Sequence, residues 1–311
     1  MSLRPIFAET IAEVGKSDDK LVVLVGDISH GILSKFRSEN SNRYFNIGIS
    51  EPGMVNIAAG LSASGLVPVI HTIAPFLIER SYEQIKLDFA YQNLGANFIS
   101  VGGAFEYAKL GCSHHCYTDY SLMSKFETCD IYFPGTPNEF AAIFKQVYNN
   151  GRINYFRLTE YPNVTTHSSS VIFPGLAITE REGTDLTIVV VGALLDRVRN
   201  VAEYLESQGK SVDILYLHTL KPLDLSTIVS SVRKTQRLLV VEENHVSDGV
   251  FSAINNELGG QFKFAKKHLA IKGFVKIYGT YEALTEEAGL SENHIRVAAF
   301  DLLQTATTKA D

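Results

Sequence analysis

Short apolar strands alternate with helical patterns along the whole chain, and this alternation constrains the fold more than any other feature. In the first half, apolar runs predict strands at residues 21–25, 67–71, 97–101, 131–133 and 155–158. Between them, apolar residues at helical spacing predict helices at 7–14, 54–63, 76–91 and 140–148. Such an alternation is typical of a parallel sheet whose two faces are both covered by helices.

The same alternation resumes after a polar interruption at residues 161–175, which contains two prolines. We interpret residues 163–183 as a surface linker. Beyond it, strands are predicted at 186–191, 211–215 and 238–242, and helices at 196–207, 225–234 and 250–258. The sequence therefore predicts an α/β protein with two doubly wound domains, residues 1–162 and 184–311.

Composition excludes several classes of function. The 311 residues carry a formal net charge of -6 and no basic run, which argues against a nucleic-acid partner. No apolar run is long enough to cross a bilayer, and the first ten residues lack the apolar core of a signal peptide. Three cysteines fit a reducing compartment. We therefore expect a cytoplasmic protein with no nucleic-acid or membrane partner.

Glu51 is the strongest candidate for chemistry. It stands in Arg-Tyr-Phe-Asn-Ile-Gly-Ile-Ser-Glu-Pro-Gly-Met (43–54), between an apolar strand and a helix, where open α/β sheets bind their ligands. A carboxylate flanked by Ile47, Ile49 and Met54 is partly desolvated, which disfavours its charged form and suits it to share a proton with a weakly basic ring nitrogen. A helix-capping or solvated glutamate is the competing interpretation.

Phe76 and Asp27 occupy two other strand ends. Phe76 follows the strand at 67–71, where a helix is predicted to start, and could either stack on a planar ring or fill the core. Asp27 follows the first strand, and a turn or N-cap aspartate is as good an interpretation as a ligand-binding one. Arg80, in the same predicted helix as Phe76, is interpreted as structural.

Two adjacent histidines, His114 and His115, follow Gly111 in a predicted loop. A histidine can donate to a substrate oxygen or move a proton near neutral pH. With Cys112 and Cys116 the pair could also bind zinc, but buried thiols near a turn are the simpler interpretation, and we predict no metal site in this chain. The glycine pairs of the sequence lack the spacing of a phosphate-binding loop.

Taken together, these segments resemble the C-terminal half of transketolase, its pyrimidine-binding domain followed by its C-terminal domain. The resemblance covers essentially the whole chain and rests on the order and spacing of Gly26-Asp27, Phe-Asn-Ile-Gly-Ile-Ser-Glu (45–51), Ile-Ala-Ala-Gly-Leu (57–61), Tyr-Glu-Gln-Ile (82–85), Gly-Cys-Ser-His-His (111–115) and Leu-Lys-Pro-Leu-Asp (220–224). It implies that Glu51 hydrogen-bonds the aminopyrimidine ring of thiamine diphosphate and that Phe76 stacks on this ring. It also implies that Asp27 lies near the cofactor and that His114 faces the substrate.

A second subunit is implied by what the chain lacks. Members of the family bind the diphosphate and its Mg²⁺ through a Gly-Asp-Gly motif and a distant asparagine on a separate domain, and no Gly-Asp-Gly occurs in this sequence. The resemblance therefore implies a split enzyme whose N-terminal transketolase-like partner subunit holds the diphosphate and Mg²⁺. Because the cofactor of the family lies between protomers, we expect a two-fold heterotetramer.

Three positions depart from the pattern of transketolases that act on sugar phosphates. An acidic residue that reads a donor hydroxyl is replaced by Leu110, an upstream histidine by Gly102, and a phosphate-binding arginine by Glu160. A carboxylate repels a phosphate, and Arg157 compensates only if its side chain leaves the interior of its strand. These losses favour a modified or nucleotide-linked sugar over ordinary pentose phosphates.

The leading interpretation is one subunit of a thiamine-diphosphate-dependent transferase that moves a two-carbon ketol unit between sugars. The β subunit of a 2-oxoacid dehydrogenase shares this two-domain arrangement and is the first alternative. A 1-deoxyxylulose-5-phosphate synthase is normally one longer chain. A non-catalytic scaffold is the remaining alternative, and the presence of Glu51 and Phe76 argues against it.

Overall fold

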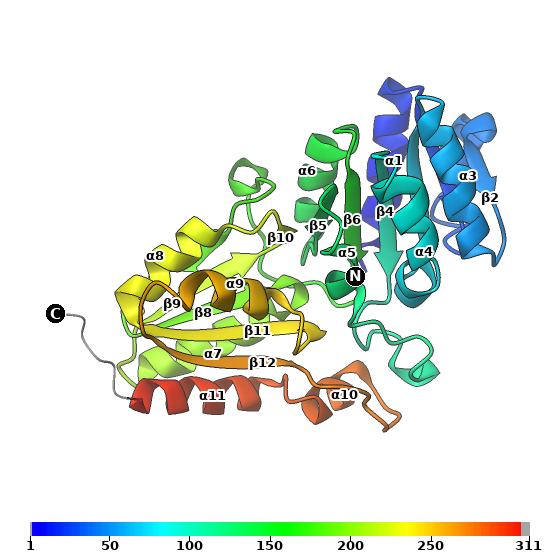
Figure 1. Cartoon of the computed structure of the whole chain (residues 1–311). Helices are drawn as coiled ribbons and strands as arrows, with labels where there is room; N and C mark the ends of the chain where they lie inside the picture. Colours follow the sequence, from blue (N-terminus) through cyan, green and yellow to red (C-terminus); the bar gives the residue numbers. More distant parts are fainter. Residues whose placement is uncertain (1, 306–311) are drawn as a thin grey trace.

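The chain forms two twisted sheets with helices on both faces of each, and the computed structural model describes residues 2–305 (Figure 1). The first sheet is parallel except for β10, with the strand order β10 (Thr219–Lys221), β5 (Cys129–Tyr132), β6 (Ile153–Leu158), β4 (Ala96–Val101), β3 (Val67–Ile73), β1 (Leu21–Val25) and β2 (Tyr44–Asn46). The second is parallel except for β7, with the order β12 (Ala265–Ile271), β11 (Arg237–His245), β8 (Leu186–Val191), β9 (Val212–Leu217) and β7 (Ile178–Arg181). The predicted α/β class with two mostly parallel, doubly wound sheets is confirmed.

Helices connect the strands. The α-helices are α1 (Arg4–Ser17), α2 (Ser34–Glu39), α3 (Glu51–Ala63), α4 (Tyr82–Gln84), α5 (Asp119–Met123), α6 (Pro137–Val147), α7 (Leu195–Ser207), α8 (Leu225–Thr235), α9 (Val250–Leu258), α10 (Tyr281–Glu287) and α11 (Glu292–Gln304). Two π-helical segments are η2 (Pro75–Glu79) and η3 (Ile85–Ala90), and the short 3-10 turns are η1 (Ser41–Arg43), η4 (Ala108–Leu110), η5 (Ser169–Val171) and η6 (Gly192–Leu194).

Strand β1 shows why the central strands read as continuous apolar runs. Its five residues, Leu-Val-Val-Leu-Val, are all buried. Alternate residues point to opposite faces, so that Leu21, Val23 and Val25 pack in one core cluster with α1 and α6, whereas Val22 and Leu24 pack in the other with α3. Both faces of the strand are therefore apolar, as expected for a buried parallel sheet.

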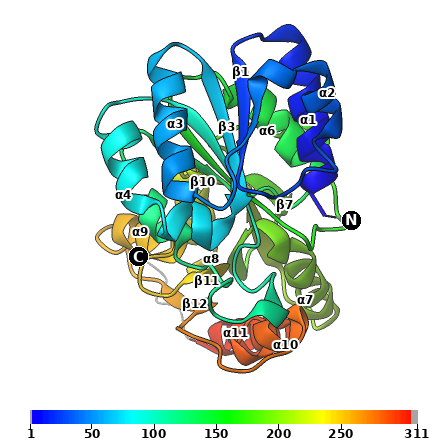
Figure 2. The same ribbon diagram turned by 90° about the vertical axis from the view of Figure 1, so that its right-hand side faces the viewer.

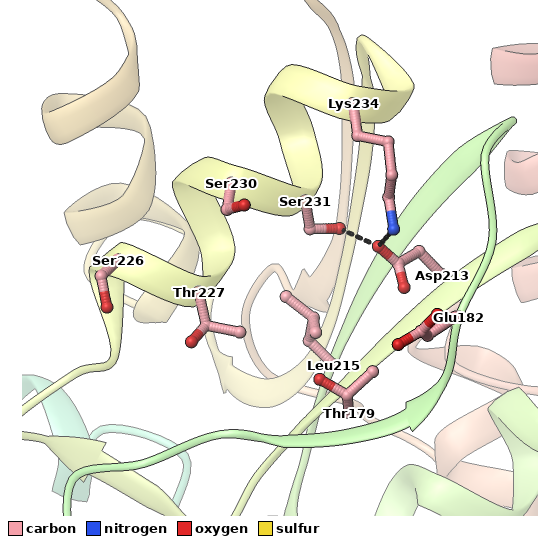
Figure 3. A pocket seen from close by; sticks show the side chains of 9 residues that line it. All are labelled: Thr179, Glu182, Asp213, Leu215, Ser226, Thr227, Ser230, Ser231 and Lys234. Atoms are coloured by element: carbon pink, nitrogen blue, oxygen red, sulfur yellow. Dashed lines mark hydrogen bonds and ion pairs between the residues drawn. The ribbon is translucent and has the colours of Figure 1, made fainter.

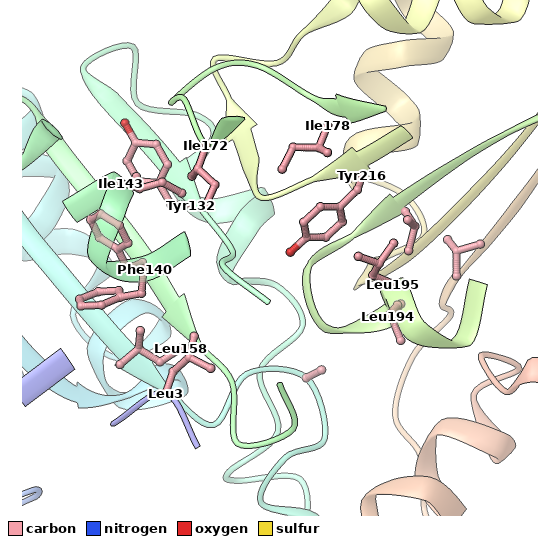
Figure 4. Packing of buried hydrophobic residues seen from close by; sticks show 14 of the residues in the cluster. Leu3, Tyr132, Phe140, Ile143, Leu158, Ile172, Ile178, Leu194, Leu195 and Tyr216 are labelled. Atoms are coloured by element: carbon pink, nitrogen blue, oxygen red, sulfur yellow. The ribbon is translucent and has the colours of Figure 1, made fainter. Parts of the chain in front are cut away.

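Each of the two core clusters contains residues from both halves of the chain. Figure 4 shows Tyr132 and Phe140 from the first half of the chain in the same buried cluster as Ile178, Leu195 and Tyr216 from the second. Strand β10 also crosses over, because this segment of the second half pairs antiparallel with β5 of the first sheet. The sequence analysis missed β10, since a strand of three residues paired with a distant segment leaves no periodic signal.

The predicted helix at 76–91 differs from the observed structure. The segment is divided into η2, α4 and η3, and the amides of Arg80 and Tyr91 donate to carbonyls five residues earlier, those of Pro75 and Lys86. These wide turns change the direction in which the side chains of the segment point, and such π-bulges occur frequently at functional sites. The predicted linker range, 163–183, contains η5 and the edge strand β7.

Candidate active site

Glu51 begins α3 at the carboxyl edge of the first sheet. Its side chain is only 2% exposed, although Ile49, two residues earlier, is 75% exposed. Asn46, at the end of β2, fixes the preceding turn because its side-chain oxygen accepts hydrogen bonds from the amides of Gly48 and Asp27. The strand-to-helix turn predicted around Glu51 is therefore present, and it buries the carboxylate at the rim of the sheet.

Arg80 contacts both Glu51 and Phe76. Its Nη1 donates to Glu51 Oε2 at 2.7 Å, and its guanidinium carbon lies 4.1 Å from the centroid of the Phe76 ring. The sequence analysis did not foresee this ion pair, which gives the buried Glu51 carboxylate a cationic partner. Phe76 lies in the π-helical segment η2, and Arg80 directly follows it.

His114 also contacts the Phe76 ring. The two ring centroids are 5.1 Å apart with an interplanar angle of 71°, and the hydroxyl of Ser113 is 3.0 Å from His114 Nδ1. A two-residue antiparallel bridge between Ala104 and Cys116 closes the base of the loop that carries His114. Glu51, Phe76 and His114, three of the predicted site residues, are thus brought together through Arg80 and the Phe76 ring.

His115 and the cysteines of this loop do not join the group. His115 is buried against Phe105, with ring centroids 5.2 Å apart, and burial lowers the pKa of its imidazole. Cys112 is exposed, whereas Cys116 is buried. Within residues 2–305, no three His, Cys, Asp or Glu side chains are arranged to hold a metal ion.

Asp27 occupies a separate corner of the same sheet edge. It has a left-handed backbone conformation (φ 57°), and its carboxylate is hydrogen-bonded to His30 at 2.9 Å and to Asn46 at 3.2 Å. The hydrogen bond with His30, followed by that with Asn46, lowers the pKa of this exposed carboxyl group. Asn46 links Asp27 to the turn that precedes Glu51.

Comparison with known proteins decides the family. Residues 1–161 match the family model for the transketolase pyrimidine binding domain, and residues 175–295 match that for the transketolase C-terminal domain. The chain belongs to the transketolase family. Both matches agree with the two sheets described above and with the resemblance found in the sequence.

Several relatives span the full length of this transketolase-family chain. It is 27% identical to the 6-deoxy-6-sulfo-D-fructose transketolase subunit SqwH of Clostridium sp. (strain MSTE9), over 97% of this chain and 94% of that protein. It is also 27% identical to one subunit of the apulose-4-phosphate transketolase of Actinobacillus succinogenes, over 96% and 98% of the two chains. A solved structure described as a split gene transketolase, inactive beta4 tetramer, matches with a TM-score of 0.87 at 27% identity, covering 97% of this chain and 98% of that chain.

The positions that depart from the sugar-phosphate pattern are now located. A side chain at Gly102 has no room, because a Cβ there would collide with the ring of Tyr107, which lies directly against this glycine. Leu110 is 54% exposed at the tip of the His114 loop. Glu160 lies 4.0 Å from Arg4, so that the two charges partly neutralise each other. Sequence reasoning gave no signal for Tyr107, since only the fold brings its ring to Gly102.

Arg157 does not supply the missing positive charge. Its side chain is buried, its Nε donates to Asp119 at 3.0 Å, and its guanidinium lies 4.0 Å from the centroid of the Phe133 ring. These contacts hold the Arg157 guanidinium in the interior of the protein, so Arg157 does not replace the phosphate-binding arginine that is missing at Glu160.

A polar cavity of about 370 Å³ in the second half of the chain carries no comparable chemistry (Figure 3). It lies between α8 and the strands β7 and β9, and among the described residues that line it Asp213 has the one buried carboxylate. Ser231 donates to this carboxylate and Lys234 forms an ion pair with it at 2.6 Å.

No helix within residues 2–305 is long and apolar enough to cross a membrane.

Proposed function

We propose that this chain is the C-terminal subunit of a split transketolase that transfers a two-carbon ketol unit between sugars with thiamine diphosphate. The observation that carries the proposal is the position of Arg80. A flat cationic group with N–H donors already fits against the face of Phe76 while it bonds to Glu51. An aminopyrimidine ring needs the same two contacts, an aromatic face and a carboxylate, so these residues fit the cofactor.

Glu51 would hold the ring nitrogen of the cofactor and share a proton with it, and Phe76 would stack on the ring. Burial of Glu51 keeps water from competing for this hydrogen bond. When bound, thiamine diphosphate supplies a nucleophilic carbon that carries the ketol unit. His114, beside Phe76, would donate a proton to a substrate oxygen or accept one near neutral pH. Asp27 would contribute a negative charge near the cofactor.

The proposal includes an N-terminal partner subunit that holds the diphosphate and Mg²⁺, in a two-fold heterotetramer. Four large apolar side chains in the segment that carries Glu51 and in the segment around η3 are exposed: Ile49, Ile57, Leu87 and Tyr91. They lie before and within α3 and along η3, and α3 and η3 pack against each other. Apolar side chains grouped in this way mark a protein-protein interface. An interface there would place the partner next to the Glu51 carboxylate.

The relatives support a modified sugar as substrate. The two relatives described above are named for 6-deoxy-6-sulfo-D-fructose and for apulose 4-phosphate, and neither name is that of xylulose 5-phosphate or ribose 5-phosphate. The replacements at Gly102, Leu110 and Glu160 point in the same direction. We therefore propose ketol transfer on a modified sugar rather than on xylulose 5-phosphate and ribose 5-phosphate.

Calorimetry tests the proposal. This chain, a candidate N-terminal subunit encoded beside it, and a mixture of the two are each titrated with thiamine diphosphate in the presence of Mg²⁺. We expect binding only by the mixture. Binding by this chain alone would contradict the shared site. If the mixture binds and then reduces an artificial electron acceptor with pyruvate, the 2-oxoacid dehydrogenase alternative is correct.

A further inference from the structure

Glu79 is the last residue of η2 and precedes Arg80, but the two side chains make different contacts. Arg80 bonds to Glu51. Glu79 Oε1 instead accepts a hydrogen bond from the hydroxyl of Thr118 and lies 3.6 Å from Cys116 Sγ. Two consecutive residues therefore tie the end of η2 to two different segments of the chain.

Both groups that face Glu79 are hydrogen-bond donors. The hydroxyl of Thr118 donates to Oε1. Cys116 is fully buried, and burial raises the pKa of its thiol, so that the sulfur keeps its proton and donates to the same oxygen. Because two donors converge on one carboxylate oxygen, Glu79 is joined to residues 116–118 at two points.

Cys116 and Thr118 stand at the end of the loop that carries His114. Cys116 closes this loop through its antiparallel bridge with Ala104. His114 is only two residues before Cys116, so a contact that fixes Cys116 also restricts where the imidazole can lie. The imidazole in turn contacts the Phe76 ring, with centroids 5.1 Å apart.

Glu79 and Phe76 belong to the same short helix, three residues apart. The loop meets this helix at both residues, since its base bonds to Glu79 and His114 contacts Phe76. A loop attached at two points has less conformational freedom than a loop attached at one. The bonds of Glu79 therefore limit how far His114 can move from the Phe76 ring.

Tyr117, between the two residues that contact Glu79, makes its contacts with the second half of the chain. Its carbonyl accepts a hydrogen bond from the amide of His245, at the end of β11, at 3.0 Å. Its ring lies nearly parallel to that of His245, with centroids 6.1 Å apart, and edge-on to Phe274, with centroids 6.4 Å apart. Figure 2 shows the same loop extending from the first sheet to α10. The second half of the chain thus holds the loop through Tyr117.

We propose that Glu79 is a positioning residue that holds the His114 loop beside Phe76, and that the second half of the chain supports this loop through Tyr117. The inference rests on the ketol transfer proposed above, in which His114 exchanges a proton with a substrate oxygen. Glu79 acts on this step through His114 and touches no reacting atom. A proton is transferred efficiently only between groups within hydrogen-bond distance, so a small displacement of His114 lowers the rate.

Ring-current shifts in the NMR spectrum of the isolated chain measure the position of His114, whose signals are assigned with His114→Gln. The change that Phe76→Leu causes in the shifts of the His114 ring protons gives the contribution of the Phe76 ring. We expect Glu79→Ala to reduce this contribution by about half or more. Glu79→Gln should retain it, because its amide oxygen still accepts from Thr118.

Glu83→Ala is the matched control, since Glu83 is an exposed glutamate of the neighbouring α4. It should leave the contribution of the Phe76 ring unchanged. Because Glu79 is also exposed, its substitution is expected to preserve the fold. An undiminished contribution of the Phe76 ring in Glu79→Ala overturns the proposal.

Kinetics of the reconstituted complex test the consequence for the reaction, with 6-deoxy-6-sulfo-D-fructose as ketol donor and glycolaldehyde as acceptor. Glu79→Ala should lower kcat by about tenfold to a hundredfold and leave the KM for the ketol donor within about twofold of the wild-type value. Glu79→Gln should retain kcat within about threefold, because the acceptor oxygen remains. Equal losses of kcat in the two variants, or a wild-type kcat in Glu79→Ala, contradict positioning by this hydrogen bond.

Variants of His245 test the support from the second half. His245→Phe keeps a ring against Tyr117, whereas His245→Ala removes it. The contribution of the Phe76 ring to the His114 shifts should stay near its wild-type value in the first variant and fall in the second. Equal contributions in the two variants overturn the role of Tyr117.

The NMR measurement also separates failure of this inference from failure of the proposed function, because it needs neither cofactor nor substrate. If the complex transfers no ketol unit while Glu79→Ala reduces the contribution of the Phe76 ring, the positioning of His114 is upheld and the proposed function fails. If the complex is active and Glu79→Ala leaves that contribution unchanged, the positioning alone fails.

Discussion

Arg80 Nη1 donates to Glu51 Oε2 across 2.7 Å, and this ion pair balances the charge of a carboxylate that is only 2% exposed. A buried carboxylate that loses its partner keeps the cost of desolvation without the compensating bond. We predict that Arg80→Ala lowers the free energy of unfolding of the isolated chain by about 1–3 kcal/mol. Urea denaturation followed by circular dichroism measures this change. Lys86→Ala, an exposed residue of the neighbouring η3 segment, is the control and should change stability by less than about 0.5 kcal/mol.

Glu51→Gln separates the chemical role of the carboxylate from its structural one. The amide oxygen can still accept from Arg80, so folding and assembly are expected to persist. Turnover of the reconstituted complex should fall by roughly 10²–10⁴-fold, because an amide does not share a proton with a ring nitrogen. Glu83→Gln, an exposed carboxylate of α4, should leave turnover unchanged. Wild-type turnover in Glu51→Gln would remove Glu51 from the mechanism.

Phe76 should contribute to cofactor retention more than to the fold. Its ring is partly exposed and contacts Arg80 and His114. Phe76→Ala removes an aromatic contact worth about 0.5–1.5 kcal/mol, which corresponds to cofactor binding weakened roughly two- to tenfold. Calorimetric titration of the complex with thiamine diphosphate measures this loss. Phe173→Ala, an exposed phenylalanine of the second half, should show no change, and equal effects in both variants would argue against stacking.

The sequence predicted the central strands well because their signal is local. The run at 186–191 became β8 with the same bounds, since a strand buried on both faces is apolar throughout. The contact between Arg80 and Glu51 was not predictable, because it joins residues 29 positions apart and belongs to a π-helical segment. The ring of Tyr107 lies against Gly102, which has a positive φ, and periodicity reveals neither the contact nor the backbone conformation.

The resemblance identified the candidate side chains but not the residues that contact them. Glu51, Phe76 and His114 were found from the order and spacing of short segments, and the structure groups them. Their assigned roles remain predictions. Asp27 was selected by the same resemblance, yet its hydrogen bonds are to His30 and Asn46 rather than to this group. Spacing along the chain identified the strand ends, but only tertiary packing decides which side chains meet.

Glu106 makes stability depend on pH in a way that can be isolated. Burial raises the pKa of its carboxyl from 4.5 in the unfolded chain to about 8 in the folded one. Between these values the folded state binds a proton that the unfolded state has lost, so this group's contribution to stability falls as pH rises from about 4.5 to about 8. Thermal unfolding of wild type and Glu106→Gln at a series of pH values measures it. As pH rises over that range, the Tm of the wild type should fall relative to that of Glu106→Gln, and at higher pH the difference between the two Tm values should remain constant. A difference independent of pH would mean that Glu106 ionises normally.

Asp119 and Arg157 form a buried ion pair whose removal should be far more damaging than that of a surface pair. Asp119 is fully buried and accepts from Arg157 Nε at 3.0 Å and from the Tyr155 hydroxyl at 2.6 Å. Asp119→Ala leaves the Arg157 guanidinium buried without its counter-charge, which costs about 3–5 kcal/mol. Glu13→Ala, which removes the exposed ion pair with Lys145, should cost less than about 1 kcal/mol. Both values come from urea denaturation under one set of conditions. Similar losses in the two variants would mean that Arg157 reaches solvent, and its exclusion from phosphate binding would then have to be reconsidered.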